Sequence, residues 1–292
     1  MFFLNTSLAS KQEIAFTIVS FAIVAVFIHR ALYIRGFFEL PLSKGDHRDC
    51  SLLQMLSCLG LYFANSFFLT PLIYQKMMTS SFITSFLQTQ ESQGIFIQSV
   101  YFGLNLLLIG TYTFFPKNAF FSKIWKDESL KNSYLYDISL GFLTWFVAFP
   151  VIVVVNTLCE TINSFLFKIE EIDQVAVKFL KNNTSSLPAL VFALTLIIVA
   201  APFIEEFLFR GCLQNFLRKI IGVKFSIVVT SLFFSLLHFS FSQQASNFPL
   251  LVSLFMFSLY LGFVYEKTRS LSSSIILHMT FNTISAVRII LN

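Results

Sequence analysis

The sequence predicts an all-α, polytopic transmembrane helix bundle of about eight spans, with a functional site between its C-terminal helices. The composition is the first observation behind this fold class. Hydrophobic residues make up 56% of the 292 residues and charged residues only 12%, with a mean hydropathy of +0.76. Soluble domains contain about 25% charged residues, and one of this size has too little interior to hide so much apolar surface. The second observation is that the apolar residues gather in runs of about 20, the length a helix needs to cross a bilayer.

These runs predict where the spans lie and how they are oriented. The first run lacks a basic segment before it, so we expect no cleaved signal peptide. Most of the 20 Lys and Arg residues fall in the loops after the first, third, fifth and seventh spans. The positive-inside rule then places these loops in the cytoplasm and both termini outside. The spans are predicted at 14–34, 52–74, 94–115, 138–158, 187–208, 225–241, 248–265 and 271–291.

Three further features complete the outline. Residues 160–183, after the fourth span, have apolar side chains at helical spacing and most of their charges on the other face, which predicts an amphipathic helix at the membrane surface. The basic loops account for the formal net charge of +5, so nucleic acid is not expected as a partner. No ligand spacing relates the cysteines, so we expect neither a disulfide framework nor a zinc site from Cys50, Cys58, Cys159 and Cys212.

The stretch APFIEEFLFRG places Glu205, Glu206 and Arg210 in an otherwise apolar run. A carboxylate there costs several kcal/mol of desolvation unless something pairs with it. Residues four apart share a helix face, so Glu206 is predicted to pair with Arg210. Glu205 lies about 100° around the helix and has Phe209 at its own i+4 position. The pattern predicts one locked carboxylate and one available as a general base. The alternative is an Arg–Glu clamp between helices, with Glu205 facing water.

Two histidines are predicted to lie inside apolar helices, His238 in SLFFSLLHFS and His278 in SSSIILHMTFN. A lone buried histidine is usually a hydrogen-bonded core residue, but ionisable groups inside spans mark functional sites. His278 shares a helix face with Asn282, and an imidazole with an amide can stabilise an oxyanion. Phe234 shares a face with His238 as a packing support. We therefore expect Glu205, His238, His278 and Asn282 to converge around one cavity.

In order and spacing, these motifs resemble those of a known family. EEFLFR, FSLLH and HMTFN are similar to the three motifs of the CAAX protease and bacteriocin-processing (CPBP, or Abi) family of intramembrane proteases, which includes the type II CAAX prenyl endopeptidases. The resemblance covers about residues 185–292 and predicts a CPBP-like protease core there. Residues 1–184 resemble no family and are predicted to hold transmembrane helices and the interfacial helix.

The resemblance implies an intramembrane endopeptidase in which water attacks a peptide bond. Glu205 and His238 would activate the water, and His278 with Asn282 would stabilise the oxyanion. Glu206 and Arg210 would organise Glu205. The implied partners are a peptide or protein substrate at the membrane and the lipid bilayer itself, in an integral membrane protein of the cytoplasmic or inner membrane if the host is bacterial. Whether the substrate is prenylated stays open.

Two alternatives remain open from the residues. Glu205, His238 and His278 are candidate ligands for a divalent metal such as zinc, as a two-His-one-carboxylate set with an open position. HExxH is absent, however, and a metal-free mechanism fits equally well. The second alternative is that the chain is a non-catalytic membrane protein. A transporter, a scaffold or an immunity protein would use the same polar residues for packing or binding. No repeat is visible, which argues against a transporter built from two halves.

Overall fold

The computed structural model describes residues 10–41, 50–114, 123–126, 130, 132–167, 174–184 and 186–291. These residues form helices and no β-strand, apart from one isolated bridge between Lys126 and Ser270. Among them, seven helical segments are long and apolar enough to cross a membrane, which confirms the predicted all-α polytopic bundle. These segments are Lys11–Ile34, Leu52–Met77, Glu91–Thr113, Tyr134–Leu166, Leu187–Leu236, Phe241–Thr268 and Leu271–Leu291.

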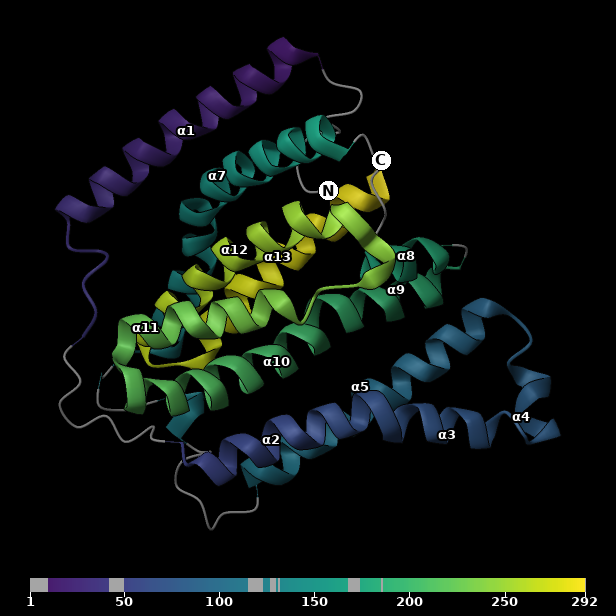
Figure 1. The fold of residues 1–292 in the computed structure, drawn as a ribbon. Coiled ribbons are helices and arrows are strands. Elements are labelled where there is room, and N and C mark those ends of the chain that lie inside the picture. The colour runs from purple at the N-terminus through teal and green to yellow at the C-terminus, as the bar shows by residue number, and fades with distance from the viewer. Residues whose placement is uncertain are drawn as a thin grey trace.

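The N-terminal helices lie in two places: the first one packs beside the later helices, and the others lie together on the opposite side (Figure 1). The N-terminal elements are α1 (Lys11–Ile34), α2 (Leu52–Ala64), the π-helical η1 (Asn65–Leu69), α3 (Thr70–Met77), α4 (Ser81–Phe86) and α5 (Gln90–Phe114). The later ones are α7 (Tyr134–Phe167), α8 (Val175–Asn182), α9 (Leu187–Thr195), η3 (Leu196–Ala200), α10 (Ala201–Glu206), η4 (Phe207–Gln214), α11 (Asn215–Leu236), η5 (Phe241–Ser246), α12 (Asn247–Thr268) and α13 (Leu271–Leu291).

Gly222 explains how seven segments accommodate eight predicted spans. The predicted spans 187–208 and 225–241 both fall mainly in the 50-residue segment Leu187–Leu236. At Gly222 the backbone leaves the helical conformation with a φ of 77°, a left-handed value that glycine adopts without steric cost. The chain reverses there, and α11 returns beside η4 and α12 (Figure 1).

The core of the bundle is formed by α7, α11, α12 and α13, and α1 packs on the outside of α7. Close approach of α7 and α13 depends on Gly141, because a Cβ at this position would collide with the backbone of Ser273. The helices α2 and α5 form a second group that meets the core through η3, α10 and η4. The site helix α10 is therefore covered by both groups.

The four cysteines are free and buried. Cys50, Cys58 and Cys212 pack in the hydrophobic cluster that joins α2 to η4. Burial raises the pKa of the Cys50 thiol to about 12, so this side chain stays protonated near neutral pH and acts as a small apolar packing group.

The predicted amphipathic helix 160–183 is wrong as a single interfacial element. Residues 160–167 continue α7, residues 168–173 lie outside the described residues, and α8 begins at Val175. In the α7 part, Glu160 and Asn163 are buried while Phe165 is 83% exposed. The polar face therefore points into the bundle and the apolar face outward, the arrangement suited to lipid rather than to a membrane surface. The helix α8 packs against α9 and α13.

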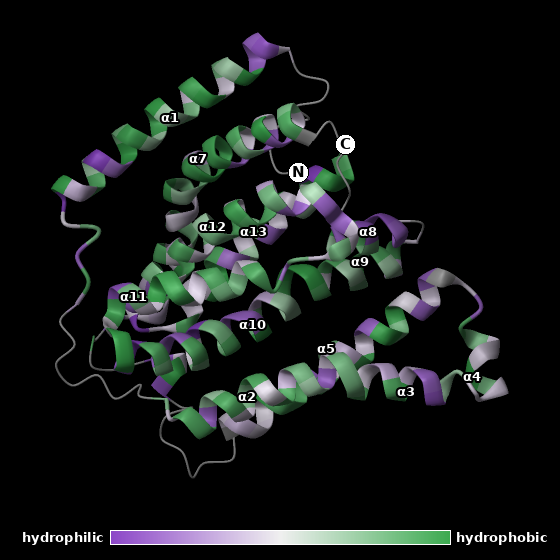
Figure 2. Ribbon diagram, viewed as in Figure 1, coloured by the Kyte–Doolittle hydropathy of each residue, from purple (hydrophilic) through white to green (hydrophobic). Residues whose placement is uncertain are grey.

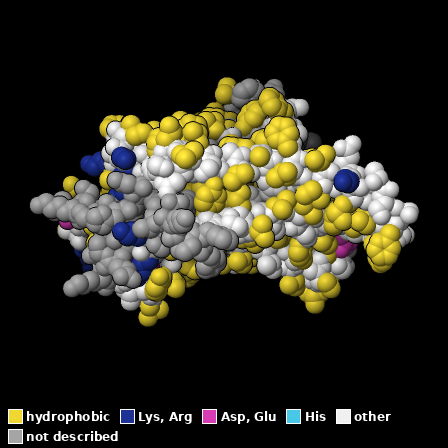
Figure 3. Space-filling view, turned by 90° about the horizontal axis from the view of Figure 1, so that it is seen from below, with side chains coloured by type: hydrophobic (Ala, Val, Ile, Leu, Met, Phe, Trp, Pro, Cys, Tyr) yellow, Lys and Arg dark blue, Asp and Glu magenta, His cyan; other side chains and the backbone are white. Residues whose placement is uncertain are grey.

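The outer surface has the character of a membrane protein. Green, hydrophobic ribbon dominates most helices in Figure 2, and Figure 3 shows hydrophobic side chains spread over one face, with most of the visible Lys and Arg gathered at one end. Two contacts tie basic loops together: Lys267 Nζ donates to Glu39 O at 3.0 Å, and Ser270 Oγ donates to Trp125 O at 3.1 Å. The chain is a multi-pass membrane protein. Its orientation and the division at residue 184 stay predictions.

Candidate active site

Two π-helical turns flank the short helix α10 that carries the two glutamates. Pro202 lacks an N–H and its ring crowds the carbonyl four residues earlier, which favours a wider turn just before it. Side-chain amides bind carbonyls in both wide turns: Asn282 Nδ2 donates to Ile197 O at 2.8 Å, and Asn215 Nδ2 donates to Arg210 O at 3.1 Å. The path of this helix is thus held by residues of α11 and α13.

Glu206 is the centre of a buried polar cluster. Its Oε1 accepts from Arg210 Nη1 at 3.0 Å, so the predicted i, i+4 pair is present, and both side chains are 0% exposed. The same oxygen lies 2.9 Å from His278 Nδ1. Arg210 Nη2 donates to Ser258 O at 3.1 Å and to Ser258 Oγ at 2.5 Å. Its guanidinium also lies 4.9 Å from the ring centroid of Phe234. The cluster ties η4 to α12 and α13.

Glu205 lies beside this cluster without being part of it. Its side chain is 22% exposed, whereas that of Glu206 is fully buried. Glu205 Oε2 lies 3.9 Å from His278 Nε2, and among the described residues this buried oxygen has no hydrogen-bond partner. The two adjacent glutamates therefore differ as the sequence predicts, and His278 stands between them with one ring nitrogen toward each.

His238 does not lie within a helix, contrary to the prediction. The helix α11 ends at Leu236, and His238 follows in the turn. The helix stops because the chain beyond it is held by another contact: Asn247 accepts from Ser240 N at 3.0 Å and donates to Ser240 O at 2.7 Å. The imidazole stays beside α11, where His238 Nδ1 lies 2.8 Å from Phe234 O and the two rings are 4.9 Å apart.

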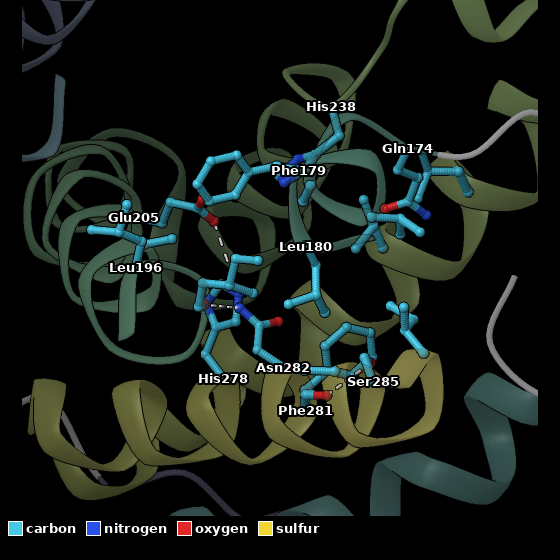
Figure 4. A pocket seen from close by; sticks show the side chains of 18 of the residues that line it. Gln174, Phe179, Leu180, Leu196, Glu205, His238, His278, Phe281, Asn282 and Ser285 are labelled. Atoms are coloured by element: carbon cyan, nitrogen blue, oxygen red, sulfur yellow. Dashed lines mark hydrogen bonds and ion pairs between the residues drawn. The ribbon is translucent and has the colours of Figure 1, made fainter. Parts of the chain in front are cut away.

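All four expected residues, Glu205, His238, His278 and Asn282, line one cavity of about 500 Å³ (Figure 4). They come from α10, the turn after α11, and α13. Most of the remaining wall is apolar and comes from α5, α8, η3, α12 and α13. Its apolar residues include Phe102, Phe179, Leu180, Leu196, Leu250, Leu254 and Phe281. The cavity is thus in the size range of ligand-binding pockets; it has a polar side and is set among helices that span the membrane.

Comparison with known proteins agrees with this geometry. Residues 187–284 match the family described as type II CAAX prenyl endopeptidase Rce1-like. The chain contains an Rce1-like domain. No curated protein and no solved structure matches the chain. The matched range contains Glu205, Glu206, Arg210, His238, Ser258, His278 and Asn282, while α5 and α8, which complete the cavity wall, lie outside it.

Hydrogen-bond partners restrict what the two histidines of the Rce1-like domain can do. The Phe234 carbonyl only accepts, so His238 carries its hydrogen on Nδ1 and presents a lone pair on Nε2 when neutral. An ionised Glu206 carboxylate likewise only accepts, so His278 carries a hydrogen on Nδ1. Nε2 of His278 donates only when the ring is an imidazolium. An oxyanion role for His278 therefore requires the charged ring, placed between Glu205 and Glu206.

The metal candidates of the Rce1-like domain do not gather as a ligand set. Each histidine has its Nδ1 held by an acceptor, which is how metal-binding histidines are commonly oriented. Yet no three His, Cys, Asp or Glu side chains within the described part of the chain are grouped closely enough to hold a metal ion. Glu205, His238 and His278, as the structure places them, do not fit a metal site.

Some residues of the site could not be found by sequence reasoning. Ser258 contacts Arg210 across 48 residues of sequence, and nothing in the apolar run around it marks this serine. The cavity wall from α8 was predicted as a surface helix. The Ile197 carbonyl is available to accept a hydrogen bond from Asn282 because η3 is π-helical. Pro202 is the one sequence signal for that wide turn.

Proposed function

We propose that the protein is an intramembrane endopeptidase that hydrolyses a peptide bond with a water molecule activated by Glu205 and His238. The observation that carries this proposal is the single cavity lined by Glu205, His238, His278 and Asn282. Amide hydrolysis needs a base, a partner that shares the proton, and donors for the developing oxyanion, all within hydrogen-bond reach of one point. These residues supply each of those groups.

In the proposed reaction, water is held between the Glu205 carboxylate and the Nε2 lone pair of His238. The water oxygen forms a bond to the substrate carbonyl carbon while its proton passes to Glu205. The oxyanion receives hydrogen bonds from the His278 imidazolium and from the Asn282 N–H that Ile197 does not occupy. The C–N bond then breaks, and the proton on Glu205 goes to the leaving amine. The net reaction consumes one water and releases a carboxylic acid and an amine.

Glu206 and Arg210 have a different task in this proposal. Glu206 holds His278 by Nδ1 and thereby fixes the direction of Nε2, while Arg210 and Ser258 hold Glu206. The expectation that Glu206 would organise Glu205 is therefore replaced by one in which it orients His278.

The substrate is proposed to be a peptide or protein segment reached from the membrane, because the cavity lies among membrane-spanning helices and its remaining wall is largely apolar. The family resemblance supports a CAAX-type protease, in a cytoplasmic or inner membrane if the host is bacterial. The rival is a non-catalytic protein, and the buried Glu206–Arg210–Ser258 cluster favours it in one respect, since such a cluster also locks three elements together.

The experiment that tests the proposed function compares the protein termini in cells with wild-type protein, the Glu205→Gln variant and a Glu39→Gln control. Glu39 is an exposed carboxylate outside the cavity. We expect a set of new protein ends in wild-type and Glu39→Gln cells that is absent from Glu205→Gln cells. Equal sets of ends in all three strains, with equal amounts of protein in the membrane, would favour the non-catalytic rival.

A further inference from the structure

Gln243 is a buried glutamine at the cavity that the proposed reaction does not use. It lies in η5, shortly after His238, and its side chain lines the cavity. The residue is 2% exposed, and its Oε1 atom has no hydrogen-bond partner among the described residues. A buried amide oxygen in this state costs free energy. The terminal torsion of a glutamine is soft, so the amide can turn to meet a donor that enters the cavity.

The backbone on both sides of Gln243 is held by Asn247. Its Nδ2 atom donates to Ser240 O at 2.7 Å and to Gln244 O at 2.9 Å. Gln244 has a φ of 46°, in the left-handed region that a residue with a side chain adopts only at a cost in free energy. Its side chain is exposed, whereas Gln243 is buried. In this turn, Gln243 therefore reaches the cavity and the adjacent Gln244 does not.

Two more glutamines line the same cavity from elements outside the Rce1-like domain. Gln98 lies on α5, and Gln174 lies immediately before α8. Gln174 occupies the N-cap position of α8, yet its side chain makes no capping hydrogen bond. In Figure 4 it lies on the opposite side of the cavity from Glu205. Among the described lining residues there are thus three glutamine amides besides Asn282, each from a different element.

Uncharged amides are suited to binding a peptide main chain. A carboxamide offers both an acceptor oxygen and N–H donors, the two functions that each peptide unit presents. A phosphate presents acceptors and is typically bound by Arg, but Arg288, the one described Lys or Arg in the wall, already has an interaction of its own. The lining part of α13 runs from His278 to Ile289, about 16 Å at 1.5 Å per residue. This length matches about five residues of extended chain.

We propose that Gln243, with Gln98 and Gln174, forms a subsite that binds the main chain of an extended substrate segment. In this subsite the orphaned Oε1 of Gln243 accepts a hydrogen bond from a peptide N–H of the substrate. The three glutamines bind substrate and take no part in breaking the peptide bond. The inference deepens the proposed function, on which it rests for the word substrate, but peptide binding can be measured without cleavage.

The binding test uses the full-length Glu205→Gln protein in detergent, which the proposed reaction leaves unable to cleave. The probe is a fluorescent apolar hexapeptide with acetyl and amide ends, together with versions that are N-methylated at one peptide nitrogen at a time. We expect the parent peptide to bind and Gln243→Met to raise its Kd by about fivefold, the value of one neutral hydrogen bond. At one position, N-methylation should raise Kd similarly but have no further effect in Gln243→Met, because both changes remove the same hydrogen bond.

Gln244→Met is the matched control, because it removes the same kind of amide from the next residue, which is exposed and does not line the cavity. It should leave Kd unchanged. An unchanged Kd in Gln243→Met would overturn the inference, as would failure of the parent peptide to bind, because a main-chain site accepts any apolar sequence. Equal binding of all N-methylated peptides, with displacement by added anionic phospholipid, would assign the cavity to lipid and also overturn it. If Gln243→Met does not accumulate in the membrane, Gln174→Met takes its place, with the same expected rise in Kd and the same contradiction if Kd is unchanged.

The subsite and the proposed endopeptidase can fail separately. Peptide binding that depends on Gln243, in a protein whose wild-type form produces no new protein ends in cells, would refute the endopeptidase and keep the subsite. Cleavage with the same kcat/KM in wild type and Gln243→Met would refute the subsite and keep the endopeptidase.

Discussion

The two adjacent glutamates should respond in opposite ways to loss of charge. In Glu206→Gln, Arg210 loses its ion-pair partner, in a site where both side chains are 0% exposed. In Glu205→Gln, a carboxylate with one orphaned oxygen and a 22% exposed side chain becomes a neutral amide of the same shape. We expect the first change to lower stability and the second to remove activity.

The structure sets the size of the stability effect. Breaking a buried ion pair by removing one partner costs about 3–5 kcal/mol. Two hydrogen bonds from Arg210 to Ser258 and the contact with the Phe234 face remain in Glu206→Gln, and the new amide oxygen still accepts. These contacts place the expected loss near the lower end, at about 3 kcal/mol, or roughly a hundredfold in the folding equilibrium. Glu205→Gln should change stability by about 0.5 kcal/mol or less, as for a site away from such pairs.

The assay measures unfolding in mixed detergent together with cleavage of a substrate found by comparing protein termini. Glu205→Gln should unfold like wild type and cleave nothing. Glu206→Gln should unfold at lower denaturant and lose activity partly, since His278 is held less firmly. The reasoning is refuted if Glu206→Gln is as stable as wild type but inert, while Glu205→Gln still turns over.

Three further predictions concern topology, packing and metal. Reporter fusions near Lys123 should read cytoplasmic and those near Ser246 external, and the reverse would mean that loop charge does not orient this chain. Gly141→Ala should destabilise by about 2 kcal/mol or more, because its Cβ meets the backbone of Ser273, whereas Gly103→Ala, with open space around it, should be neutral or stabilising in thermal unfolding. Cleavage should survive prolonged treatment with EDTA, because the described residues do not gather three metal ligands; activity that is lost and then restored by zinc would contradict this.

The spacing of residues in the sequence predicted the features that depend on a single helix. Apolar runs located the spans because lipid imposes a length on every crossing helix. The pairing of Glu206 with Arg210 followed from the i, i+4 rule, which needs no tertiary information. The different surroundings of Glu205 followed from the same geometry. The meeting of both histidines with the glutamates was expected from the combination of motifs and not from any single one.

Features that depend on contacts between different helices could not be predicted from the sequence. The end of α11 before His238 is fixed by Asn247, which lies nine residues further along and carries no mark of that role. The buried polar face of α7 near Glu160 reads on a helical wheel like a surface helix, because period alone does not say which face meets lipid. The hydrogen bond of His278 with Glu206 and its longer contact with Glu205 depend on distances between helices. The N-terminal helices meet the site only because α2 packs against η4 and α5 packs against α10.

Because of the wide turn before Pro202, the site depends on the number of residues in η3 as well as on their type. A π turn holds one residue more than the α-helical turn it replaces, and the Ile197 carbonyl that Asn282 binds lies within it. Helix α13 is therefore docked at an acceptor supplied by the backbone, which side-chain substitution along η3 does not remove. Deleting a single residue of η3 would close the turn, return that carbonyl to its own helix, and leave Asn282 without its anchor. In this protein, deletion of one codon in an apolar stretch would therefore inactivate the cavity, as loss of Glu205 would.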